Sequence, residues 1–151
     1  MTAQHILVPI DFSEYADQAL DYAIALGKPL QAHLTVLHVI HLTPWAMGDM
    51  VTSFPGTFLE QVETEAQQLM QASLGRVHDA GLQGETVIVH GVPFQVIIET
   101  AKDKGVDLIV MGTHGRTGLP HTLMGSVAEK VVRLSPCPVL VTREKREASV
   151  E

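Results

Sequence analysis

The chain has 151 residues, of which 46% are hydrophobic and 18% are charged, and this composition favours one globular domain with a sizeable core over a disordered chain. Its formal net charge of −7 disfavours nucleic acid as a partner, because an acidic surface repels phosphate backbones. The single cysteine, Cys137, excludes an internal disulfide framework and a metal site built from several cysteines.

Nothing in the sequence indicates a membrane or secretory destination. No apolar run approaches the roughly 20 residues that a membrane-spanning helix needs. The first residues, MTAQHILVPIDF, show neither the basic segment nor the cleavage site of a secretory signal. We therefore expect a cytoplasmic protein without membrane insertion.

Apolar runs and helical periodicity predict nine elements that alternate between strand and helix. β-Branched apolar runs predict strands, and apolar residues that recur at spacings of three and four predict helices. Glycines and prolines predict the helix ends. The first half of the chain predicts a strand at 5–10, a helix that begins at Ser13 and ends at Gly27 and Pro29, a strand at 32–40 and a loop at 41–56. A long helix follows and ends at 81–84. The remainder predicts a strand at 85–91, a helix beginning near Pro93, a turn and strand at 104–112, a helix beginning at Ser126 and a strand at 137–143.

Each predicted helix has an apolar face that we expect to point into the core. The expected inward residues are Ala16, Leu20, Ala23, Ile24 and Gly27 in the first helix, Leu59, Val62, Ala66, Leu69, Met70, Ser73 and Val77 in the second, Phe94, Ile97, Ile98 and Ala101 in the third, and Val127, Ala128, Val131 and Val132 in the fourth.

The alternation of apolar strands and helices predicts an α/β fold, with an open parallel sheet covered by helices on both faces. If the chain winds outward in both directions from the first strand, the five strands have the order 3-2-1-4-5. Ligands then bind between strands one and four, where the winding direction reverses. Without an internal repeat or a linker, we expect one domain over 1–151, with a core at 4–143 and a tail at 144–151.

The glycine-rich segment GTHGRTGLPHTLMGS (112–126) predicts an anion-binding site at the start of a helix. Glycine is the costliest residue to order, so four glycines indicate left-handed dihedrals or a close approach of the backbone. Free N–H groups and the helix dipole favour negative charge, while Ser126 adds a hydroxyl and Arg116 a positive charge. The alternative is a flexible connection that needs turn residues. The motifs of P-loop NTPases and standard dinucleotide binders are absent.

The spacing Gly112-x2-Gly115-x9-Gly125-Ser126 resembles the signature of the ATP-binding branch of the universal stress protein family. The resemblance extends from residue 4 to 143 through ILVPIDFSE, HGVPFQVIIETAK and GSVAEKVVRLSPCPVLVTR, and segment 41–60 is the least similar part. It implies a Rossmann-like fold of the adenine nucleotide alpha hydrolase-like type. It also implies that ATP, or another adenine nucleotide, binds with Mg²⁺ across the switch point.

The resemblance further implies which residues hold the nucleotide. Asp11 would lie near the ribose or a phosphate-bound Mg²⁺, although an aspartate here is also a preferred helix cap. The backbone of Val39 would read the adenine edge. Pro120 and His121 depart from the pattern, because family members often carry a basic residue there. The implied binding residues are Pro9, Ile10, Asp11, Val39, Gly112, Thr113, His114, Gly115, Arg116, Gly118, Gly125, Ser126 and Val127.

No metal site made by the protein alone is expected. His38 and His41 are three residues apart across a strand end, where their side chains would not share a face.

Two classes of function remain open. The first is a regulatory module that binds ATP and signals to an unidentified protein partner through conformation or dimerisation. The second is a slow ATP hydrolase or phosphoryl-transfer protein. Rapid transfer needs a bridging metal, a base or positioned water, and charge on the phosphate. The loops supply Asp11, Arg116 and backbone amides but no second carboxylate, so we favour the binding module, without catalytic residues.

A receiver domain that accepts phosphate is excluded. Such a domain needs an acidic pair after the first strand and an aspartate after the third, and the sequence has PIDFS and VHGVPF at these places.

The last strand predicts a homodimer. In the order 3-2-1-4-5 it lies at an edge of the sheet, where unpaired backbone groups invite another strand. Val139, Leu140 and Val141 would pair antiparallel with their copies across a twofold axis, and the family resemblance implies the same arrangement. The alternative is a monomer whose charged tail covers this edge.

Overall fold

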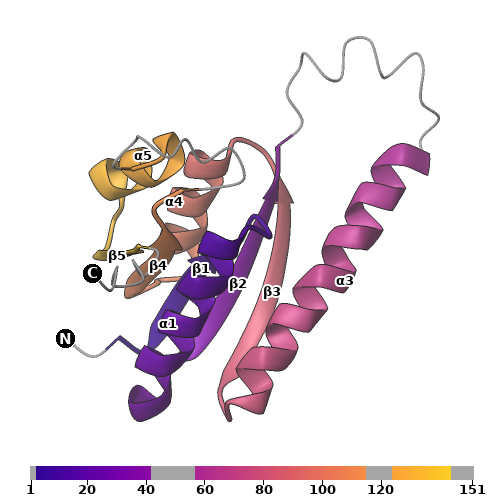
Figure 1. Cartoon of the computed structure of the whole chain (residues 1–151). Helices are drawn as coiled ribbons and strands as arrows, with labels where there is room; N and C mark the ends of the chain where they lie inside the picture. Colours follow the sequence, from indigo (N-terminus) through magenta and orange to yellow (C-terminus); the bar gives the residue numbers. More distant parts are fainter. Residues whose placement is uncertain (1–2, 42–56, 115–123, 144–151) are drawn as a thin grey trace, which may run out of the picture.

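The computed structural model shows one sheet covered by helices, and it describes residues 3–41, 57–114 and 124–143 (Figure 1). Residues 42–56 of the loop predicted at 41–56, residues 115–123 and the predicted tail at 144–151 lie outside the described residues. The strands are β1 (His5–Pro9), β2 (His33–Ile40), β3 (Gln83–His90), β4 (Leu108–Gly112) and β5 (Val139–Thr142), and the helices are α1 (Glu14–Leu30), α3 (Thr57–Asp79), α4 (Pro93–Asp103) and α5 (Ser126–Leu134).

All five strands are parallel and have the order β3-β2-β1-β4-β5, which confirms the predicted fold class. β1 occupies the centre, between β2 and β4, so the winding direction reverses between β1 and β4 as expected. β3 and β5 form the two edges of the sheet. β5 is shorter than predicted, and β3 begins two residues earlier than predicted.

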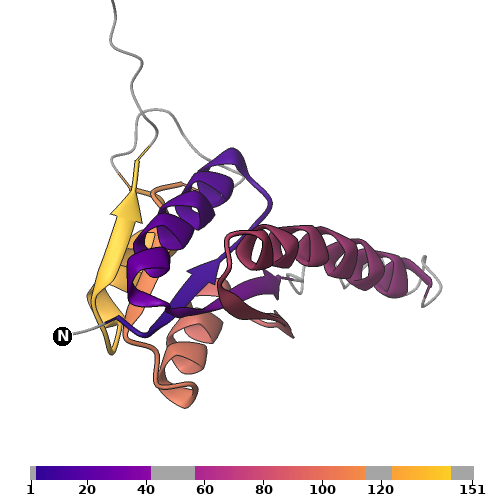
Figure 2. The ribbon, with the colours of Figure 1, turned by 90° about the horizontal axis from the view of Figure 1, so that it is seen from below.

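The helices form two layers, with α1 and α3 on one face of the sheet and α4 and α5 on the other (Figure 2). Successive side chains of a strand point to opposite faces, so each strand feeds both layers. In β1, Ile6 and Val8 pack in the core beneath α1 and α3, and Leu7 packs in the core beneath α4 and α5. All three are fully buried, which explains why the strand is apolar throughout.

Helix α1 runs through both residues that were predicted to end it. Gly27 is buried where α1 crosses β2, and a Cβ there would lie 3.1 Å from Leu34 Cδ1, so this glycine serves packing. Pro29 stands in the last turn, where its missing N–H removes a single helical bond. The helix ends at Gln31, whose left-handed backbone (φ 50°) lets its N–H donate to the last carbonyls.

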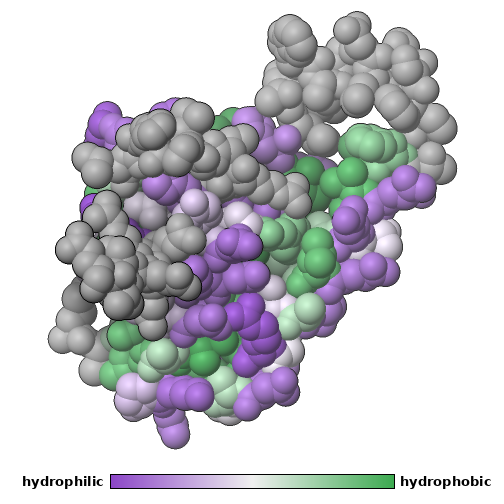
Figure 3. Space-filling model, in the orientation of Figure 1, coloured by the Kyte–Doolittle hydropathy of each residue, from purple (hydrophilic) through white to green (hydrophobic). Residues whose placement is uncertain are grey.

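Some residues predicted to point inward are exposed. Leu59 and Leu69 of α3 are 39% and 40% exposed. Leu59 precedes Ala66, the first buried residue in the described part of this helix, and Leu69 stands beside the fully buried Met70, so the inward face is narrower than predicted. Figure 3 accordingly shows hydrophobic surface over the start of α3. Val132 of α5 is 45% exposed beside the fully buried Val131, so the inward face of α5 is narrower than predicted. In α4, Val96 is buried although the pattern did not select it.

Among the described residues, no helix combines the length and the apolar character needed to cross a bilayer.

Candidate functional site

A cleft of about 890 Å³ opens at the carboxyl ends of β1, β2 and β4, at the predicted switch point of the sheet. Its volume lies in the range of about 300–1,000 Å³ that small-molecule sites occupy. Gly115, Arg116 and Gly118 lie outside the described residues, as do Pro120 and His121. All other predicted binding residues line the cleft, namely Pro9, Ile10, Asp11, Val39, Gly112, Thr113, His114, Gly125, Ser126 and Val127.

The loop between β1 and α1 is fixed by hydrogen bonds at the edge of the cleft. Asp11 Oδ1 accepts from both the backbone N–H and the hydroxyl of Ser13 (3.0 and 2.5 Å). Ser13 Oγ in turn accepts from Ala16 N (3.2 Å), so Ser13 is the N-cap of α1. Of the two residues that could cap this helix, Ser13 does so and Asp11 does not. Asp11 instead holds the capping residue, and this places its carboxylate in the cleft wall.

The same loop is joined to the end of β2. Ile10 N donates to Leu37 O (2.7 Å), and His38 Nδ1 lies 2.7 Å from Ile10 O. Because a carbonyl oxygen only accepts, His38 Nδ1 carries the proton. Phe12 has a positive φ of 65°, an uncommon backbone conformation that costs about 1–3 kcal/mol, and its ring packs 4.3 Å from the His38 ring. His38 thus supports the backbone at the floor of the cleft.

The two described glycines of the predicted anion loop serve close packing of the chain. A Cβ on Gly112 would lie 2.9 Å from Tyr15 Cβ and 3.0 Å from Tyr15 O, so only glycine allows α1 to pack this closely on β4. A Cβ on Gly125 would lie 3.0 Å from Thr113 O, to which Gly125 N donates (2.6 Å). Neither glycine has a positive φ. The sequence suggested either left-handed dihedrals or a close approach of the backbone, and at these two glycines it is the close approach.

The start of α5 lines the cleft. Gly125 is the N-cap, and no side chain caps the helix. Ser126 is the first helical residue, and it lines the cleft together with Val127 and Ala128. The first N–H groups of a helix have no partner within the helix. Together with the helix dipole, such groups favour negative charge at this end of the cleft.

A second helix also begins at the cleft. Pro93 lines it as the first residue of α4, and the N-cap Val92 makes no side-chain hydrogen bond. The positive ends of two helix dipoles therefore converge on this side of the sheet.

Two carboxylates, rather than the single one predicted, line the cleft. Asp11 is joined by Glu129, which the inspection of loops missed because it stands in the first turn of α5. Arg133 Nη2 donates to Glu129 Oε1 (2.6 Å), which offsets part of its charge. Among the described lining residues there is neither a lysine nor an arginine.

Part of the cleft lining is apolar, and sequence inspection missed most of it. Most of these residues belong to strands and helices, so their apolar character indicated only a core. Ile40 and Met111 stand at or near strand ends, and that position was the available signal. The main members are Leu37, Ile40, Ile97, Met111 and Met124.

Comparison with known proteins settles the family. The model of the universal stress protein family matches residues 2–143. The chain belongs to the universal stress protein family. Among the relatives of this universal stress protein, YxiE of Bacillus subtilis is 36% identical over 146 residues, which cover 91% of this chain and 97% of YxiE.

Solved structures of the family share the fold. Protein MJ0577 of Methanocaldococcus jannaschii superposes with a TM-score of 0.87 at 35% identity, covering 97% of this chain and 100% of that one. The universal stress protein UspA from Lactobacillus plantarum gives a TM-score of 0.81 at 30% identity, covering 95% and 99%.

Proposed function

We propose that this universal stress protein binds an adenine nucleotide, ATP with Mg²⁺, in the cleft between β1 and β4. The observation that carries the proposal is the composition of the cleft lining. Its apolar side chains suit a base, and the start of α5, which has no side-chain cap, suits phosphates.

Two structural neighbours support an adenine nucleotide as the ligand of this fold. A universal stress protein solved in complex with cAMP has a TM-score of 0.71 at 24% identity. The universal stress protein from Archaeoglobus fulgidus solved in complex with dAMP has a TM-score of 0.65 at 20% identity. At these identities the likeness shows the fold alone, so the choice of ATP for this chain rests on its own cleft and on its G-x2-G-x9-G-S spacing.

The residues of the cleft fit such a ligand. The N–H groups at the start of α5 would receive the phosphates, and Arg116 of the glycine-rich segment would add positive charge. Asp11 offers a carboxylate oxygen, the ligand type that Mg²⁺ prefers, beside that end of the cleft. Val39 would present its backbone to the adenine edge.

We infer a regulatory role rather than catalysis. Asp11 and Glu129 are the carboxylates of the described lining; Asp11 is bonded to Ser13 and Glu129 to Arg133. A general base must have an atom free to accept the proton of the attacking group. Cations must also stabilise the negative charge that develops on the transferred phosphate. This inventory supports binding, with slow hydrolysis or phosphoryl transfer as the alternative.

The proposal is tested by calorimetric titration of ATP and Mg²⁺ into the wild type and two variants of one residue. Ser126→Pro removes one amide donor, and proline is well tolerated at the first position of a helix after an extended residue. A hydrogen bond to a charged group contributes about 1.5–3 kcal/mol, so we expect affinity to fall between about tenfold and about 150-fold. Ser126→Ala keeps the amide and is the matched control. Equal affinity of the proline variant and the control would refute the phosphate position, and a wild type that binds no adenine nucleotide would refute the function.

We also propose that the protein is a homodimer paired through β5 and that it signals to a regulatory partner. β5 is an edge strand, and Leu140 at its centre is 37% exposed. Val132 and Leu134 of the neighbouring α5 are exposed as well. An edge strand with exposed apolar side chains is a surface that proteins normally cover.

A further inference from the structure

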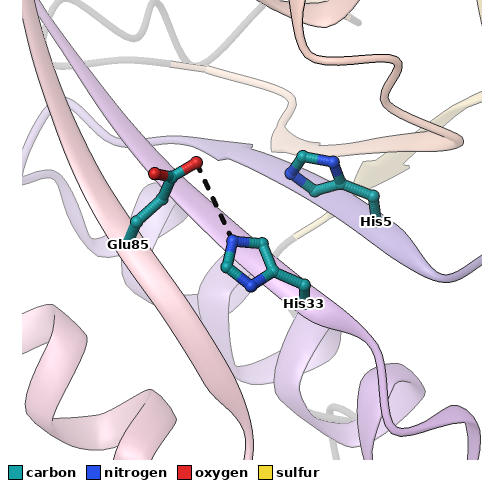
Figure 4. A group of neighbouring side chains, drawn as sticks. All are labelled: His5, His33 and Glu85. Atoms are coloured by element: carbon teal, nitrogen blue, oxygen red, sulfur yellow. Dashed lines mark ion pairs between the residues drawn. The ribbon is translucent and has the colours of Figure 1, made fainter.

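A second group of polar side chains lies at the end of the sheet opposite the cleft. His5, His33 and Glu85 come from the three neighbouring strands β1, β2 and β3, near the amino end of each (Figure 4). The potential ligand atoms of these three side chains all lie within 4.8 Å of one another. Sequence inspection gave no sign of this group, because its members are far apart in the chain.

The strand register brings the three side chains together. His5 pairs with His33 across β1 and β2, and Thr35 pairs with Glu85 across β2 and β3. Because residues two apart on a strand share a face, His33 and Thr35 point to the same side. That side also carries Leu7, which packs beneath α4 and α5. The group therefore continues the α4 face of the sheet.

The rings and the carboxylate already point toward one another. Glu85 Oε1 lies 3.8 Å from His33 Nε2, and the His5 and His33 rings meet edge to face with centroids 5.0 Å apart. The buried hydroxyl of Thr35 donates to Glu85 Oε1 (3.0 Å) and therefore accepts from His5 Nε2, which lies 2.7 Å away and carries a proton in this arrangement. His33 and Glu85 are about two-fifths exposed, so an ion can reach the group from solvent.

The surroundings of His5 and Glu85 lower the pKa of both groups. Burial, followed by the neighbouring His33, lowers the pKa of His5, which favours the neutral imidazole. A hydrogen bond from Lys104 lowers the pKa of Glu85, which favours the carboxylate. His5 also bonds to the backbone of Lys104, and such a second bond is the usual means by which a metal-binding histidine is oriented.

We propose that His5, His33 and Glu85 bind a divalent transition-metal ion of the Zn²⁺ type, with water as the fourth ligand. Two imidazoles and one carboxylate are a common ligand set for Zn²⁺. With metal–ligand bonds of about 2.0–2.1 Å, tetrahedral ligands lie about 3.3 Å apart. The ligand atoms must therefore close from separations of up to 4.8 Å, and His5 must exchange its hydrogen bond to Thr35 for the metal and release the Nε2 proton.

Lys104 is the internal competitor of the metal. Its ammonium lies 2.9 Å from Glu85 Oε1, at the end of α4, and occupies the charge position that a cation would take. When a metal binds, the Glu85 carboxylate would exchange its weak, partly exposed ion pair with Lys104 for a bond to the metal. The C-terminal end of the α4 dipole adds negative potential at this place, which favours a cation. Metal binding would then join β1, β2 and β3 at the end of the sheet away from the nucleotide.

The test is titration of nucleotide-free protein with ZnCl2 by calorimetry and with CoCl2 by visible absorption. The variants are His33→Gln, Lys104→Met and, as the matched control, His90→Gln, which breaks an exposed histidine–glutamate pair elsewhere. Loss of an outer partner of a metal site alone weakens affinity about 10–100-fold, so His33→Gln should weaken it by at least tenfold. Lys104→Met should strengthen binding by up to about fivefold, because a competing ion pair is removed.

The outcomes separate this inference from the proposed function. Metal binding that is lost in His33→Gln, kept in His90→Gln and strengthened in Lys104→Met, with ATP affinity unchanged throughout, is the expected result. Equal Zn²⁺ affinity in the wild type and His33→Gln would overturn the site. Weaker binding in Lys104→Met would overturn it as well, because Lys104 would then support the ion.

Discussion

Replacement of Gly112 by alanine should destabilise the fold, because α1 packs directly on the backbone of this residue. The added Cβ would lie 2.9 Å from Tyr15 Cβ, 3.0 Å from Tyr15 O and 3.1 Å from Tyr15 C. Two of these three atoms belong to the backbone of α1, so rotation of a side chain cannot relieve the contact. The helix or the strand must shift instead.

The expected cost follows from this geometry. Overpacking that requires backbone shifts costs about 1–3 kcal/mol. For a chain of this size, each 1 kcal/mol changes the melting temperature by about 2–4 °C. We therefore expect Gly112→Ala to lower the melting temperature by about 2–12 °C. Because Gly112 and Thr113 line the cleft, the shift should also weaken ATP binding.

Gly75 provides a control in which the same substitution should have the opposite effect on stability. It lies within α3, and a Cβ there would meet nothing within 4 Å. In a helix interior, alanine is favoured over glycine by about 0.5–1 kcal/mol. Gly75→Ala should therefore raise the melting temperature by about 1–4 °C. Thermal unfolding followed by circular dichroism measures both variants. Equal stability of Gly112→Ala and the wild type would show that the close approach of α1 to β4 is wrong.

Three further predictions concern the helix cap, the edge strand and turnover. Ser13→Ala removes the N-cap of α1 and should lower the free energy of unfolding by about 0.5–2 kcal/mol in urea titrations; an unchanged midpoint would contradict this role. Leu140→Lys should split the proposed dimer into monomers in light scattering while leaving ATP affinity unchanged, because like charges would meet near the axis. A monomeric wild type at micromolar concentration would refute pairing through β5. ATP turnover, measured as ADP release, should stay below about 1 per second, the low end of common enzyme rates. A faster rate that is lost in Asp11→Asn would favour the enzyme.

Much of the fold was predictable because its signals are local. Each strand is an apolar run bounded by turn residues, and alternation with helices leaves a parallel sheet as the natural arrangement. The switch-point rule then selected the loops that line the cleft. Asp11, Val39 and the start of α5 accordingly line one cleft, and their part in nucleotide binding stays a prediction.

The errors arise where distant contacts decide the outcome. Gly27 looks like a helix end in the sequence, but its contact with Leu34 makes it a packing residue. Leu69 fits the apolar stripe of α3, yet nothing covers enough of its side chain to bury it. Glu129 was missed because a carboxylate on a helix carries no local sign of facing a cleft. The group of His5 and Glu85 depends on register across three strands, which a linear pattern does not contain.

The hydrogen bond from Gly125 to Thr113 closes the glycine-rich connection at its base. Thr113 is in turn held by β5, since its N–H and hydroxyl both donate to Thr142 O (3.0 and 2.8 Å). The entropic cost of a closed loop grows slowly, by about 0.6 kcal/mol for each doubling of its length. We therefore expect that sequences of other lengths can be grafted between these two anchors and that such grafts alter ligand preference on a constant scaffold.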